Sequence, residues 1–111
     1  MRQVKVKLPG KAEWTVELVP RRDKRLILDG NPNWGMTYYR TRDIYIDEEL
    51  DEDALDEVLL HELTHAMLFE TQIKPTRKFD EEDVCETVGM YGRRIIGLAD
   101  KVYRKLKGQE A

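Results

Sequence analysis

The chain has 111 residues, of which 37% are charged, and a mean hydropathy of -0.65. Its length fits one compact domain, which we expect to span residues 1–111. The net charge of -3 argues against a nucleic-acid binder, because such domains are usually strongly basic. A single cysteine excludes an internal disulfide framework, and no apolar run approaches the ~20 residues needed to cross a bilayer. We therefore expect a soluble cytoplasmic protein whose partners are neither nucleic acid nor membrane.

The N-terminal part of the chain alternates apolar and polar residues. This period of two predicts strands over residues 4–8 and 13–19, joined through the turn-sized segment PGKA as a hairpin. Residues 21–30 contain only a short apolar run, which fits a helix or a strand equally well.

Two further strands and a helix are expected in the middle of the chain. Residues 36–41 and 44–47 are rich in Tyr, Thr and Ile, which are typical of strands. The acidic stretch 47–53 suits the first turn of a helix, because carboxylates oppose the positive end of the helix dipole. Apolar residues at helical spacing then continue to about residue 70.

The C-terminal part predicts more helix. After a basic linker at residues 74–78, apolar residues recur at helical spacing over residues 80–107. Three glycines interrupt this region, so we expect one helix that bends or two helices in succession. The whole pattern predicts an α+β fold, in which a small, mainly antiparallel sheet of three to four strands packs on two to three helices.

The motif His-Glu-Leu-Thr-His lies inside the first predicted helix. His61 and His65 are four residues apart, so both imidazoles lie on one helix face and can reach one zinc ion. Glu62 is rotated by about 100° from His61, which places its carboxylate beside the metal as a general base. A chance pair of helix-surface histidines is the alternative, but the chain has only two histidines and both belong to the motif.

A catalytic zinc usually has three protein ligands and one open position. The chain has no third histidine, so the third ligand is a carboxylate or Cys85. We favour Glu82, because it shares a helix face with small residues that let its helix approach the histidines. We expect Cys85 itself to be a small buried residue. The other candidates are Glu81, Asp80, Asp83 and Glu86, the last also as a residue that orients a ligating histidine.

At these residues the chain resembles the ImmA/IrrE-type metallopeptidases and their short phage relatives, which are minimal gluzincin-like zinc proteases. The resemblance covers roughly residues 34–92 and rests on Gly35-Met36-Thr37, on the strand 43–46, on HELTHAMLFE and on the E-x-x-x-E motif of residues 82–86. It implies that His61, His65 and Glu82 bind zinc, and that residues 43–47 line the substrate cleft. The chain differs from the larger members in having no DNA-binding domain.

The expected function is zinc-dependent hydrolysis of a peptide bond in a peptide or protein substrate, with Glu62 as general base. One alternative is a catalytically inactive zinc-binding phage protein that acts as an interaction module, and another is a metal-free interaction protein. Four tyrosines are candidates to stabilise an oxyanion, although tyrosines in strands more often serve packing. They are Tyr38, Tyr39, Tyr45 and Tyr91.

Overall fold

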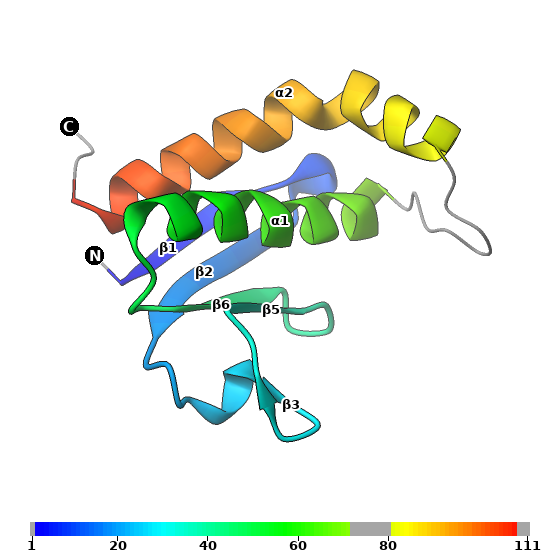
Figure 1. The fold of residues 1–111 in the computed structure, drawn as a ribbon. Helices are drawn as coiled ribbons and strands as arrows, with labels where there is room; N and C mark the ends of the chain where they lie inside the picture. The colour runs from blue at the N-terminus through cyan, green and yellow to red at the C-terminus, as the bar shows by residue number, and fades with distance from the viewer. Residues whose placement is uncertain (1, 72–80, 109–111) are drawn as a thin grey trace.

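The computed structural model describes residues 2–71 and 81–108, apart from the side chains of residues 81 and 82. It contains a four-stranded sheet, a separate two-stranded hairpin and two helices (Figure 1). The α+β class predicted from the sequence is confirmed. The predicted linker at residues 74–78 and the candidate Asp80 lie outside the described residues.

The sheet has the strand order β1-β2-β6-β5. Strands β1 (Gln3–Lys7) and β2 (Glu13–Val19) form the predicted antiparallel hairpin, with Val6 opposite Trp14. Strand β6 (Asp43–Asp47) runs parallel to β2, and β5 (Gly35–Tyr38) pairs antiparallel with β6 and forms the edge. Two of the three pairings are antiparallel, so the sheet is mixed but mainly antiparallel.

Strand β2 is connected to β5 through a short hairpin that does not join the sheet. A 3-10 turn, η2 (Lys24–Leu26), precedes β3 (Ile27–Leu28), which pairs with β4 (Asn31–Pro32). Asp29 and Gly30 connect these strands with positive φ angles of 52° and 80°. An Asp-Gly pair favours such a left-handed turn. The apolar run within residues 21–30, which fits a helix or a strand equally well in the sequence, thus forms the end of a 3-10 turn and a short strand.

Both helices lie over the same face of the sheet (Figure 1). Helix α1 (Glu52–Thr71) begins after Asp51, whose carboxylate accepts a hydrogen bond from the Ala54 backbone N–H at 2.8 Å. Helix α2 (Glu81–Leu106) is a single helix that packs on α1 and β1. No helix in the described part of the chain is long and apolar enough to cross a membrane.

The core lies between the sheet and the two helices. Every second side chain of β1, β2 and β6 points into it, as the alternating pattern predicts. The main contributions from α1 and α2 come from apolar residues at helical spacing. They are Leu55, Leu59, Leu63, Ala66 and Met67 of α1 and Ile95, Ala99, Val102 and Leu106 of α2.

A partly buried polar cluster fixes the C-terminal end of α1 to the sheet. Glu70 accepts a hydrogen bond from the indole Nε1 of Trp14 at 2.6 Å. The same carboxylate oxygen accepts a hydrogen bond from Nε of Arg42, at 2.5 Å, in the turn between β5 and β6. Because Arg42 lowers the pKa of Glu70, and Trp14 adds to the effect, this carboxylate is ionised at neutral pH.

Candidate metal centre

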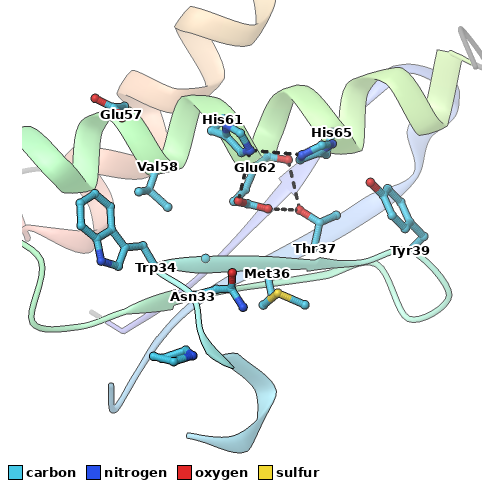
Figure 2. Close-up of a pocket in the computed structure, with 12 residues that line it drawn as sticks. Asn33, Trp34, Met36, Thr37, Tyr39, Glu57, Val58, His61, Glu62 and His65 are labelled. Atoms are coloured by element: carbon cyan, nitrogen blue, oxygen red, sulfur yellow. Dashed lines mark hydrogen bonds and ion pairs between the residues drawn. The ribbon is translucent and has the colours of Figure 1, made fainter. Parts of the chain in front are cut away.

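Helix α1 presents His61, Glu62 and His65 toward the edge strand β5 (Figure 2). The His61 side chain is 66% exposed, whereas the Glu62 side chain is only 9% exposed. The difference follows from the helix geometry: the histidines lie one turn apart on the outer flank of the helix, and Glu62 is rotated toward the sheet. The motif therefore combines two accessible nitrogen ligands with one sheltered carboxylate.

The two imidazoles lie at the separation that a shared metal ion requires. Nε2 of His61 is 3.3 Å from Nε2 of His65, and the ring planes are inclined by 72°. Two nitrogens bound at 2.0–2.1 Å to one tetrahedral zinc ion lie about 3.3–3.4 Å apart. This distance, which in the absence of a metal is also that of a hydrogen bond between the two ring nitrogens, matches the separation of two corners of a zinc coordination shell.

In the described part of the chain, the Glu62 carboxylate accepts one hydrogen bond. The Thr37 hydroxyl donates to its Oε1 at 2.6 Å, whereas Oε2 lies 3.9 Å from Nε2 of His61 (Figure 2). Among the described residues no lysine or arginine forms an ion pair with Glu62. One carboxylate oxygen is therefore occupied, and the other faces the histidines without a neutralising cation.

The close approach of β5 to α1 positions this carboxylate. A Cβ atom on Gly35 would lie 2.8 Å from Cγ1 of Val58 and 3.0 Å from Cγ of Glu62. Real Cβ contacts are essentially never as short as the first of these, so only glycine allows the strand and helix to come so near. Two residues later, Thr37 then lies within hydrogen-bond distance of Glu62.

A cavity of about 560 Å³ lies between β5 and α1, in front of the motif. The segment from Pro32 to Tyr39 forms one wall, and α1 forms the other (Figure 2). Strand residues 43–47 do not line this cavity: β6 is the inner strand, and its Ile44 and Ile46 are fully buried in the core. The expectation that residues 43–47 line the substrate cleft is thus not met at this cavity, where the edge strand β5 takes that place, and Asp47 lines an adjoining cavity instead.

Of the four candidate tyrosines, only Tyr39 lines this cavity. Burial raises the pKa of Tyr39, and the negative charge of Glu62 raises it further. Its hydroxyl therefore keeps its proton at neutral pH and can donate a hydrogen bond. Tyr38 instead donates to the backbone carbonyl of Arg25 at 2.7 Å and packs edge-on against Tyr45.

The candidates for a third ligand lie in the first turns of α2. The backbone of Glu82 belongs to this helix, but its side chain lies outside the described part, so its role as ligand stays a prediction. Within residues 2–71 and 83–108, no three His, Cys, Asp or Glu side chains form a group that could hold a metal ion. The structure thus does not bring Cys85 or Glu86 to the histidines.

The expectation that Cys85 is a small buried residue is wrong. The residue is exposed. Thr87, two positions later, is buried in its place.

Gly35 and Thr37 belong to the segments that carry the family resemblance, but no role in the site was predicted for either of them. Thr37 and Gly35 act through contacts with α1, and such contacts depend on which strand forms the edge of the sheet. The one local signal is the glycine itself, since glycine inside a strand often marks a close backbone approach.

Comparison of the chain with protein-family models, with curated proteins and with solved structures finds no match.

Proposed function

We propose that this protein is a zinc-dependent peptidase that holds its metal with His61, His65 and Glu82. The observation that carries the proposal is the 3.3 Å separation of the two histidine nitrogens beside a sheltered, cation-free carboxylate. The resemblance of HELTHA and its flanking segments to ImmA/IrrE-type metallopeptidases supports the same assignment.

The proposed chemistry is general-base catalysis by Glu62. A zinc ion bound at such a site lowers the pKa of a coordinated water and polarises the substrate carbonyl. Glu62 accepts a proton at Oε2, the oxygen that faces the histidines, and later passes it to the leaving amine. The Thr37 hydroxyl holds Oε1 at 2.6 Å, so the carboxylate keeps one orientation while it exchanges the proton.

The edge strand supplies a place for the substrate backbone. Within residues 2–71 and 81–108, strand β5 pairs with β6 alone, which leaves the other side of its backbone to an extended peptide. Such a peptide lies in the cavity that contains the histidines. The protonated Tyr39 hydroxyl, at the end of the same wall, is our candidate donor to the developing oxyanion.

A zinc-bound interaction module without hydrolysis is the second candidate function. It is favoured by exposed apolar side chains on the N-terminal half of α2, where Val84 is 47% exposed and Val88 is 62% exposed. These residues continue the apolar stripe that packs on the body of the protein further along the helix.

A digest of a broad peptide library separates the two candidates. Zinc-loaded wild-type protein and the Glu62→Gln variant are incubated in parallel, and the products are identified by mass spectrometry. The amide keeps the shape of the side chain but accepts no proton at neutral pH, so we expect hydrolysis to fall by at least ~10²-fold while zinc content is unchanged. Equal cleavage by both proteins would contradict the mechanism.

The third ligand is tested by ranking three variants. A carboxylate that binds zinc directly contributes charge and a bond, whereas a residue that only orients a ligand typically changes affinity by ~10–100-fold. We expect Glu82→Gln to weaken zinc binding more than Glu81→Gln or Glu86→Gln, measured by competition with a chelator. If Glu81→Gln binds zinc most weakly, the assignment of Glu82 is wrong.

A further inference from the structure

A second cavity, of about 540 Å³, adjoins the one at the histidines. The two cavities share Pro32, Asn33 and Trp34, the residues that lead into β5. Trp34 is 56% exposed and therefore stands between them as an accessible aromatic wall. The other residues that line the second cavity are Arg21, Arg22, Ile27 and Asp47.

Two arginines and one carboxylate line the second cavity. Arg21 is held by the buried carboxylate of Asp47, which accepts a hydrogen bond from its Nε at 2.6 Å, and it lies 3.9 Å from Glu49. Arg22 is exposed and forms no ion pair with any residue that the structure describes. One guanidinium thus neutralises Asp47, and the other remains available to a ligand.

The cavity at the histidines has the opposite protein charge. Glu57 and Glu62 line it, and no lysine or arginine does so. A substrate that lies across both cavities therefore meets carboxylates in one and a free guanidinium in the other. Bound zinc would offset the carboxylates of the first cavity, so the discrimination between substrate side chains comes from the guanidinium in the second cavity.

The register of β5 gives the spacing between the two cavities. Thr37 contacts Glu62, and Trp34 lies three positions earlier in the chain. At about 3.3 Å per residue, an extended peptide covers the roughly 10 Å between these points with three residues. A peptide bond beside Glu62 therefore places a side chain about three residues away at the second cavity.

We propose that Arg22 selects an acidic side chain of the substrate, about three residues from the cleaved bond, with Arg21 and Trp34 shaping the cavity that receives it. This inference rests on the proposed peptidase function, but it concerns recognition and can be tested without hydrolysis. Arginine suits the task because its planar guanidinium can donate two parallel hydrogen bonds to a carboxylate.

The test measures binding to zinc-loaded Glu62→Gln protein, which leaves the peptides intact. Fluorescent peptides of one neutral background carry Glu, or the isosteric Gln, at the third position before or after the central residue. We expect one of the two Glu peptides to bind about 5-fold more tightly than its Gln counterpart, the effect of one partly exposed charge pair. Adding Arg22→Gln should reduce this preference to less than about 2-fold, and Arg22→Glu should reverse it.

Arg94→Gln is the matched control, since Arg94 is an exposed arginine of α2 that lines neither cavity. It should leave the preference unchanged. Equal affinity for the Glu and Gln peptides, no binding of either, or a preference that survives Arg22→Glu would overturn the proposal. If acid-selective binding is found but the wild-type protein cleaves no peptide, then the proposed function fails and the recognition of acidic side chains stands.

Discussion

Helix α1 buries the side chains of two glutamates about two turns apart, and the two carboxylates differ in their hydrogen-bond and charge partners. The Glu62 side chain is 9% exposed and the Glu70 side chain is 8% exposed, and both point toward the sheet. Glu70 accepts hydrogen bonds from Arg42 and from Trp14. Glu62 accepts one, from Thr37, and has no cationic partner among the described residues.

The comparison shows that burial alone does not assign a role to a carboxylate. A guanidinium neutralises the charge of a buried carboxylate, and hydrogen bonds from the guanidinium and an indole occupy its oxygens, so the group serves the structure. A carboxylate with one oxygen free, beside two histidine nitrogens, is available to exchange a proton. We therefore assign a structural role to Glu70 and a chemical role to Glu62.

Exchanging each glutamate for glutamine should separate the two roles. We expect Glu62→Gln to lower hydrolysis by at least ~10²-fold and to change the free energy of unfolding by less than about 1 kcal/mol. Glu70→Gln should destabilise by about 1–2 kcal/mol, because Arg42 and Trp14 lose a charged acceptor, while hydrolysis changes little. Urea unfolding and peptide cleavage, measured on both variants, check this; equal losses of stability would remove the distinction.

Gly35→Ala should disturb the neighbourhood of Glu62 and leave that of Glu70 intact. The new methyl group would lie 2.8 Å from Cγ1 of Val58, so the strand and helix have to move apart. Overpacking of this kind costs about 1–3 kcal/mol. The control is Gly97→Ala in α2, where a Cβ meets nothing within 4 Å and helix propensity predicts stabilisation by up to about 1 kcal/mol. Thermal unfolding of both variants tests the prediction, which fails if Gly35→Ala is as stable as the wild-type protein.

Thr37→Val removes the one hydrogen bond that orients Glu62 and keeps the shape of the side chain. We expect kcat to fall by about 10-fold, roughly the value of one hydrogen bond to a charged group, with zinc content unchanged. Thr37→Ser retains the hydroxyl and should recover most of the rate. A purely structural role of Thr37 would instead lower stability and leave the rate per folded molecule unchanged.

The pairing of Glu70 with Arg42 should make the free energy of unfolding depend on pH in the acidic range. The Arg42 hydrogen bond holds its pKa below the usual 4.5, so the folded protein releases this proton at a lower pH than the unfolded chain does. The pairing therefore stabilises fully above pH 4.5, and its contribution disappears as the pH falls through the lower folded-state pKa. Asp23, whose pKa Arg25 lowers to about 2, contributes a similar loss in all variants. Unfolding free energies measured from pH 7 downward should fall less steeply in Glu70→Gln than in the wild-type protein.

Much of this fold could be predicted because its elements are amphipathic. Alternation in β1 and β2 and the helical spacing in α1 depend on neighbouring residues only, and so does the spacing of the histidines. The edge position of β5 depends instead on the parallel pairing of β2 with β6, between segments far apart in the chain. The roles of Gly35 and Thr37 follow from that edge position; a glycine within a strand signals a close approach at Gly35, but no local pattern assigns Thr37 to Glu62.

The central claim is that one face of α1 binds zinc, and elemental analysis tests it most directly. The wild-type protein and a His61→Ala/His65→Ala variant are purified in parallel, exposed to zinc and freed of excess metal. The 3.3 Å separation of the histidine nitrogens predicts close to one zinc per chain for the wild-type protein and almost none for the variant. Equal zinc content in the two proteins would contradict the account.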